Sequence, residues 1–100
     1  MIKGTTPTHI FEVDFDTDLI QEIKITYSQH ENVLVEKRTD DCEITEGKIV
    51  TKLTQEETFK FDNTKYAYVQ IRILTKAGDC LATPVTMVSI DKCLDNEVIV

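Results

Sequence analysis

Three aspartates at alternate positions are the first residues of this chain whose spacing could do chemistry. Asp14, Asp16 and Asp18 match the first three ligand positions of a calcium-binding loop, where alternate carboxylates converge on a hard cation. The rest of that loop does not fit, because its sharp turn needs glycine where the chain has Leu19 and its closing glutamate is replaced by Ile25. We therefore expect an acidic turn here, with no metal site and no other cofactor.

The residues that commonly build catalytic sites are scattered along the chain. His9 and His30 lie in different segments without cysteine, histidine or carboxylate neighbours at metal-ligand spacing, so we expect both in exposed loops. Neither Ser28 nor Ser89 lies in a Gly-x-Ser-x-Gly motif, and the glycines do not form a phosphate-binding loop. The sequence therefore predicts that the protein is not an enzyme.

The cysteines are an odd set with long spacings. Cys42, Cys80 and Cys93 include no Cys-x-x-Cys pair, which argues against a zinc site or a full disulfide framework. Cys42 also lies among acidic neighbours, which disfavour the thiolate and hence a nucleophilic role. We expect three free thiols.

Two other groups of residues are candidates for contact with a partner. Tyr66 and Tyr68 share one face of an extended chain, where they either form a binding platform or pack and hydrogen-bond within the sheet. The C-terminal Val98, Ile99 and Val100 are β-branched and apolar, and they either fold back over their own domain or dock on a neighbouring chain. Both alternatives are open for each group.

The elements that must position these residues follow from a hydrophobic period of two. Apolar residues alternate with polar ones in segments separated by short polar or glycine-containing breaks, as half-buried strands require. The predicted strands cover residues 9–15, 20–29, 33–38, 42–46, 48–53, 66–75 and 80–90. About seven antiparallel strands at this spacing favour an immunoglobulin-like β-sandwich.

Two local signals refine the end of this pattern. Gly78 can take the positive φ of a tight turn, which makes the strands at 66–75 and 80–90 direct neighbours in a hairpin. Pro84 has no N–H to donate to a sheet, so the last strand should lie at an edge or contain a bulge there.

A short helical turn is expected between the fifth and sixth strands. Thr54 and Glu57 have the spacing of a capping box, in which each side chain bonds to the backbone N–H of the other residue. Such a turn would connect the two sheets, with Phe59 and Phe61 closing the end of the core.

The sequence divides into an N-terminal arm at residues 1–8, a β-sandwich domain at 9–92 and a C-terminal tail at 93–100. Arms and tails of this kind reach into neighbouring subunits of an assembly, and termini fray unless they are held. Residues 1–7 contain one positive charge and no long apolar run, so we expect no secretory signal and a cytoplasmic location where the protein is made.

The composition narrows the function classes further. The 100 residues include 11 Lys and Arg and 18 Asp and Glu, which gives a net charge of −7. Because nucleic-acid binding depends on neutralising phosphates, an acidic chain without a basic cluster is not expected to bind DNA or RNA. The 41% hydrophobic content is ordinary for a globular domain, and no apolar run is long enough to predict a membrane span.

Three stretches of the sequence carry a resemblance: residues 1–9, residues 52–58, and residues 69–72 together with Gly78. They resemble small uncharacterised β-sandwich proteins of Firmicutes prophages that are encoded among phage structural genes. It implies a role in or around the virion, as a head, neck or tail accessory, with other phage structural proteins as partners. It implies no catalytic residues.

Two functions are consistent with these observations. The first is a non-enzymatic protein–protein interaction or structural module whose partners are other protein subunits, including further copies of itself. The alternative is a carbohydrate- or surface-binding β-sandwich, which the lack of tryptophan and the 7% aromatic content weaken.

Overall fold

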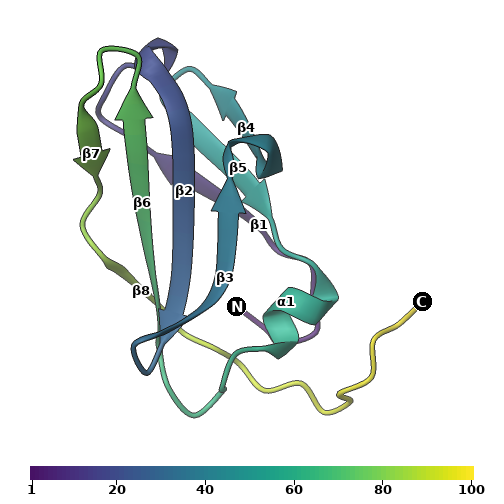
Figure 1. The fold of residues 1–100 in the computed structure, drawn as a ribbon. Coiled ribbons are helices and arrows are strands. Elements are labelled where there is room, and N and C mark those ends of the chain that lie inside the picture. The colour runs from purple at the N-terminus through teal and green to yellow at the C-terminus, as the bar shows by residue number, and fades with distance from the viewer.

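Eight β-strands form two antiparallel sheets that lie face to face, in a computed structural model that describes residues 1–100 (Figure 1). The smaller sheet has the order β1 (Thr8–Glu12), β5 (Lys48–Lys52), β4 (Cys42–Thr45). The larger sheet has the order β3 (Asn32–Arg38), β2 (Ile20–Gln29), β6 (Ala67–Thr75), and then β7 (Cys80–Ala82) and β8 (Thr86–Val88), which both pair with β6. The predicted β-sandwich is confirmed.

The strand order is that of an immunoglobulin sandwich in which one strand is missing. Immunoglobulin domains pair strands A, B, E and D in one sheet and C, F and G in the other, with C′ added beside C in some types. Here β1, β5 and β4 hold the places of B, E and D, while β3, β2, β6 and β7–β8 hold those of C′, C, F and G. Nothing holds the place of strand A, which would pair with the outer edge of β1.

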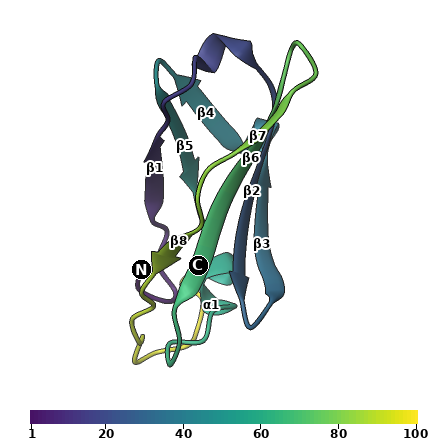
Figure 2. The same ribbon diagram turned by 90° about the vertical axis from the view of Figure 1, so that its left-hand side faces the viewer.

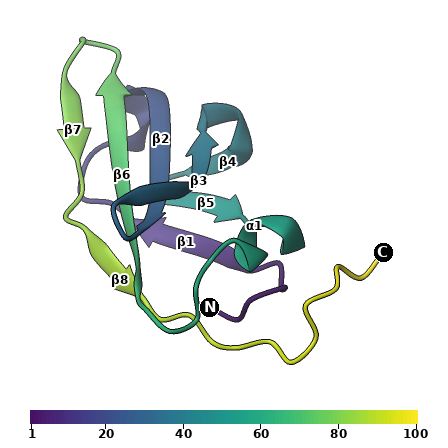
Figure 3. The ribbon, with the colours of Figure 1, turned by 60° about the horizontal axis from the view of Figure 1, so that its bottom comes forward.

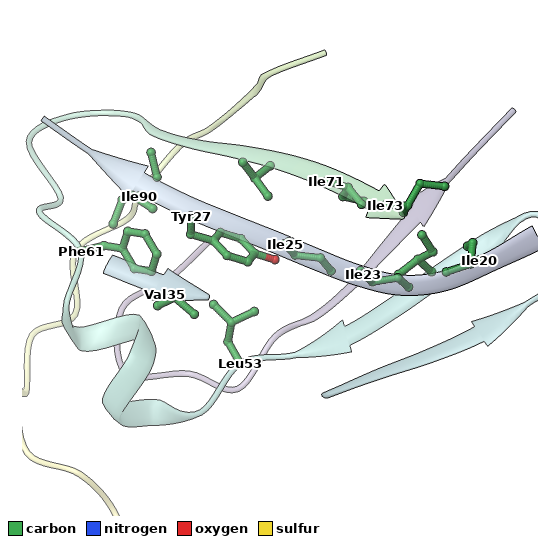
Figure 4. Packing of buried hydrophobic residues seen from close by; sticks show 13 residues of the cluster. Ile20, Ile23, Ile25, Tyr27, Val35, Leu53, Phe61, Ile71, Ile73 and Ile90 are labelled. Carbon is green, nitrogen blue, oxygen red and sulfur yellow. The ribbon is translucent and has the colours of Figure 1, made fainter. Parts of the chain in front are cut away.

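The core lies between the two sheets and is built by the inward residues of β2 and β6. Period-two alternation turns Ile25 and Tyr27 of β2, and Ile71 of β6, toward the smaller sheet, and each is almost fully buried. The Tyr27 ring meets that of Phe61 edge to face, with 6.2 Å between the centroids (Figure 4). The full buried apolar cluster is Ile20, Ile23, Ile25, Tyr27, Val35, Ile49, Leu53, Phe61, Ala67, Val69, Ile71, Ile73 and Ile90.

Two of the predicted strands differ from the structure by more than one residue. β1 ends at Glu12 and not at residue 15, although the Val13 N–H still donates to the Gly47 carbonyl at 3.0 Å. The strand expected at 80–90 is interrupted between β7 and β8, where the Thr83 side chain accepts from the Ile71 N–H at 3.1 Å. Pro84 lies in this interruption on the edge of the sheet, as predicted.

The acidic turn after β1 leads into a short 3-10 helix, η1 (Thr17–Leu19). The Asp16 side chain caps it by accepting a hydrogen bond from the Asp18 N–H at 2.9 Å. This carboxylate therefore stabilises the start of its own helical turn, a common role for aspartate at a helix N-cap.

The predicted hairpin and helical turn are both present. Gly78 has a φ of +91° between β6 and β7. Helix α1 (Gln55–Phe59) begins with the expected capping box, in which Thr54 accepts from the Glu57 N–H at 3.1 Å and Glu57 accepts from the Thr54 N–H at 2.9 Å. Phe61 closes the core as expected, but Phe59 does not join it, because its ring lies over the backbone of Gly4.

Both terminal segments are bonded to the rest of the chain. Residues 1–3 run parallel to the segment after β8, with the Lys3 N–H donating to the Asp91 carbonyl at 3.1 Å and the Asp91 N–H to the Met1 carbonyl at 2.8 Å. The tail then passes below the sandwich toward α1 (Figure 3). No helix of the structure is both long and apolar enough to cross a membrane.

Candidate interaction surfaces

Of the two candidate tyrosines, Tyr68 lies on the outer face of the larger sheet and Tyr66 lies just before the start of β6. Ala67 and Val69 point into the core, so the alternate residues Tyr66 and Tyr68 point to solvent, where they are 55% and 41% exposed. The ring contacts of the chain join His9, Phe11, Tyr27 and Phe61, and neither candidate tyrosine takes part in them. Their rings are therefore available to a partner.

Tyr68 belongs to a row of apolar side chains that crosses the larger sheet. Met87 of β8 lies directly opposite it on one side, and Ser28 of β2 lies opposite on the other, followed by Val33 of β3. Val33 is 61% exposed and Met87 56% exposed. We call Val33, Tyr68 and Met87 the apolar row. No single segment reveals it, because each member comes from a different strand.

Tyr66 and Tyr68 also line a hollow of about 470 Å³ together with His30, Glu31, Thr64 and Lys65. It lies between the β2–β3 turn and the loop that joins α1 to β6. Two consecutive residues of that turn have positive φ, His30 at 52° and Glu31 at 65°. Such backbone conformations are unfavourable outside glycine and persist only where the surroundings hold them in place.

The buried Gln29 side chain holds the two walls of the hollow together. Its amide nitrogen donates to the Asp62 carbonyl at 2.8 Å and to the Lys65 carbonyl at 3.1 Å, and its oxygen accepts from the Asp62 N–H at 2.7 Å. Hydrogen bonds from Thr64, with a smaller contribution from nearby His30, hold the pKa of the Asp62 carboxyl below its usual value. Gln29 is therefore the residue that positions the loop before Tyr66.

The three C-terminal candidates remain exposed although the tail backbone is held. The Gln55 side chain donates to the Ile99 carbonyl and accepts from the Ile99 N–H, both at 2.9 Å. The side chains of Ile99 and Val100 are largely exposed to solvent, and Val98 is 36% exposed. These contacts bring the backbone to α1 and leave the apolar side chains outside the core.

His9 does not lie in an exposed loop, and that expectation is wrong. It is part of β1, half-buried, with its Nδ1 2.6 Å from the Tyr27 hydroxyl. Burial lowers the pKa of His9 and raises that of Tyr27, so this inter-sheet hydrogen bond joins two neutral groups near pH 7. The sequence does contain a signal for this position. His9 lies two residues before Phe11 and four before Val13, so in a strand its side chain points inward as theirs do. His30 does lie in an exposed turn, as expected.

A second polar contact between elements was not predicted from the sequence. The Lys37 ammonium of β3 lies 2.7 Å from Glu57 Oε1 of α1. The same oxygen accepts from the Thr54 N–H, so one carboxylate oxygen serves both the ion pair and the capping box. This contact ties the helix to the larger sheet.

The remaining reactive side chains are dispersed. All three cysteines are free thiols, and burial is the main cause that raises the pKa of Cys42. No group of three or more His, Cys, Asp and Glu side chains is placed to hold a metal ion. Comparison of the chain with models of protein families, with curated proteins and with solved structures finds no match.

Proposed function

We propose that the chain is a non-enzymatic protein–protein interaction module that binds its partner through the outer face of the larger sheet. The observation that supports this most directly is the apolar row, in which Val33, Tyr68 and Met87 of three different strands are all exposed. Isolated exposed apolar residues are ordinary, but a group of them on one rigid sheet face is typical of an interaction site.

The chemistry of the row suits a protein partner. Tyrosine and methionine are enriched in interfaces, because tyrosine offers a large apolar ring with a polar end and methionine adapts its shape to the partner. Tyr66 extends the surface at one end of β6. Val98, Ile99 and Val100 add further exposed apolar side chains beside α1. Tyr68, at the middle of the row, is the residue whose loss should weaken binding most.

The resemblance to prophage proteins suggests which partner to test first. In that setting the module is an accessory of the virion head, neck or tail, and its partner is another phage structural protein. The products of the genes that flank its own gene are therefore the first candidates.

The experiment is co-expression with each flanking gene product, followed by size-exclusion chromatography with light scattering. A complex formed by the natural chain should be lost in a Tyr68→Lys, Met87→Lys variant. Thr26→Lys is the control, because Thr26 lies on the outer face of β2 and the substitution adds a lysine to the same sheet outside the apolar row. A complex that survives the double substitution would contradict the proposal, as would the absence of any complex with these proteins.

A carbohydrate-binding function is a second candidate, and the hollow beside Tyr66 and Tyr68 favours it. Its lining combines two aromatic rings with the hydrogen-bonding groups of Thr64, Lys65 and Glu31, a combination suited to holding a sugar ring. Titration calorimetry with oligosaccharides would support this function if a sugar bound to the natural chain and not to Tyr66→Ala. It would be ruled out if no sugar in a broad glycan panel bound.

A further inference from the structure

The outer edge of β1 carries backbone groups that have no partner. In an antiparallel pair, alternate residues exchange both backbone hydrogen bonds with the neighbouring strand, and the residues between them point their N–H and C=O away from it. The Leu53 N–H donates to the Pro7 carbonyl and the Val13 N–H to the Gly47 carbonyl, both at 3.0 Å. Since β1 pairs only with β5, the groups of Thr8, Ile10 and Glu12 face the open edge.

This edge has few of the features by which proteins usually protect exposed strands, since Glu12 is its only charged residue. β1 contains no proline, no lysine and no bulge, and it is not short compared with β4 on the opposite edge of the same sheet. Its middle residue, Ile10, is 61% exposed. An edge of this kind is a template for another strand.

A groove of about 420 Å³ lies beside the edge, between β1 and the segment from β7 to β8. Figure 2 shows the ribbons of these segments. One wall is β1 with the residues that follow it, including Phe11, Val13 and Phe15, and the other is the β7–β8 edge around Pro84. Its floor includes Val69 and Ile71 of β6. This is the space in which strand A of a complete immunoglobulin sandwich would cover the core.

The charge of the groove limits what can enter it. Glu12 and Asp14 are its only ionisable lining residues, so the groove itself carries only negative charge, although Lys48 of β5 lies opposite Glu12 across the strand pair. The C-terminal tail of a second copy ends in three consecutive apolar residues, Val98 to Val100, but Asp95 and Glu97 lie just before them. Like charges on adjacent strands are destabilising, so the groove favours a segment with lysine or arginine.

We propose that the groove binds an extended segment of a partner protein, which adds to β1 as the missing strand A. The segment alternates apolar side chains, which fill the groove against Phe11, Val13 and Val69, with outward polar ones, and it carries lysine or arginine beside Glu12 and Asp14. The exposed length of β1, five residues or about 17 Å, sets a core of five to seven residues for it. This site lies on a different face from the apolar row and does not depend on it.

The test uses a defined probe, a nine-residue peptide of alternating valine and threonine with lysine at both ends. Titration calorimetry should give binding at least tenfold tighter for this peptide than for the same peptide ended by glutamate or interrupted by a central proline. Amide chemical shifts should change at residues 8–15 and 82–86. Equal affinity for all three peptides, or shift changes confined to other residues, would overturn the proposal.

Two variants of the chain test the edge itself. Ile10→Pro removes a backbone donor that faces outward and leaves the hydrogen bonds to β5 in place. Glu12→Lys with Asp14→Lys keeps the backbone and reverses the charge, so it remains informative if the proline variant unfolds. Each should weaken the binding of the lysine-ended peptide at least tenfold. The control variant Thr26→Lys, on the outer face of the larger sheet, should bind this peptide as the natural chain does.

The other possible occupant is a second copy of the chain, and it gives a different result. A concentration-dependent dimer that Ile10→Pro abolishes, together with no binding of the lysine-ended peptide, would overturn the proposal in favour of pairing between two β1 edges. If the peptide binds at this edge but the flanking gene products do not bind the apolar row, the inference stands and the proposed function fails.

Discussion

Glutamine at position 57 should destabilise the protein more than methionine at position 37, although each substitution removes one partner of the same ion pair. The Lys37 side chain is only 10% exposed and that of Glu57 is 21% exposed. In Glu57→Gln the capping acceptor is kept, but a nearly buried ammonium loses its carboxylate. In Lys37→Met an apolar chain of similar length fills the site, and Glu57 keeps its hydrogen bond from the Thr54 N–H.

The magnitudes follow from the unequal burial of the two partners. Removing one partner of a fully buried pair costs about 3–5 kcal/mol, so the partial exposure here reduces the expected loss for Glu57→Gln to about 2–3 kcal/mol. Lys37→Met removes one charged hydrogen bond and leaves a partly hydrated carboxylate, for which we expect about 1 kcal/mol. In the double variant no unpaired charge remains, so it should be more stable than Glu57→Gln alone.

Urea denaturation followed by circular dichroism at pH 7 measures these differences, because a single domain of this size is expected to unfold in one step. Glu36→Gln is the control for an exposed carboxylate. Glu36 pairs with Lys24 at 3.0 Å and with Arg38 at 2.9 Å on the exposed face, and its substitution should cost less than about 1 kcal/mol. The argument that the buried ammonium decides the outcome would be refuted if the stability losses of the two single variants added up to the loss of the double variant. It would also be refuted if Glu57→Gln lost no more stability than the control.

The pH dependence of that pair has a definite sign. Burial raises the pKa of Glu57, but hydrogen bonds from Lys37 and from Thr54 outweigh it and hold this pKa below its ordinary value of 4.5. The folded state therefore binds fewer protons than the unfolded state near pH 4.5. The stabilisation by ionised Glu57 is present above pH 4.5 and is lost as the pH falls through the pKa of Glu57 in the folded state. The stability difference between the natural chain and Glu57→Gln should shrink accordingly in acid.

Two further predictions concern His9 and the glycines. Burial lowers the pKa of His9 below 6.5, so neutral His9 contributes fully to stability above that pH. This stabilisation is lost as the pH falls toward the pKa of His9 in the folded state. The urea midpoint should therefore be lower at pH 5.5 than at pH 7.5, and a His9→Gln variant should show a smaller difference between the two. A Cβ at Gly4 would lie 2.5 Å from the Phe59 ring at a φ of +75°, whereas at Gly78 nothing lies within 4 Å and only the φ of +91° is unfavourable. Gly78→Ala should therefore lose about 1 kcal/mol and Gly4→Ala about 2–3 kcal/mol, and equal unfolding midpoints would contradict this.

Local signals predicted much of the fold. β6 alternates over all nine of its residues, and β2 alternates from Glu22 to Gln29 after an irregularity near its start; β2 also begins and ends where the period predicts. The capping box at Thr54 and the turn at Gly78 are also local, since each depends on residues within four positions. Such features need no knowledge of which strands become neighbours.

The candidate surfaces could not be predicted in this way, because they depend on pairing between distant segments. Val33, Tyr68 and Met87 form the apolar row only because their strands pair in a particular register. The sequence of one strand does not reveal that register. β1 ends early for a similar reason, because its length is limited by β5, its only partner. The sequence identified Tyr68 as a candidate but could not place Met87 beside it, or Val33 one strand farther across the sheet.

The open edge of β1 is itself a consequence of where the preceding residues go. Strand A of an immunoglobulin sandwich would have to run beside β1, yet residues 1–7 are held below the sandwich. The Thr58 hydroxyl donates to the Thr5 carbonyl at 2.9 Å, and the chain turns at Gly4, whose positive φ and missing side chain admit the Phe59 ring. The residues best placed to cover the edge therefore stabilise α1 and the end of the core instead. The groove beside β1 is left for a strand that this segment of the chain does not supply.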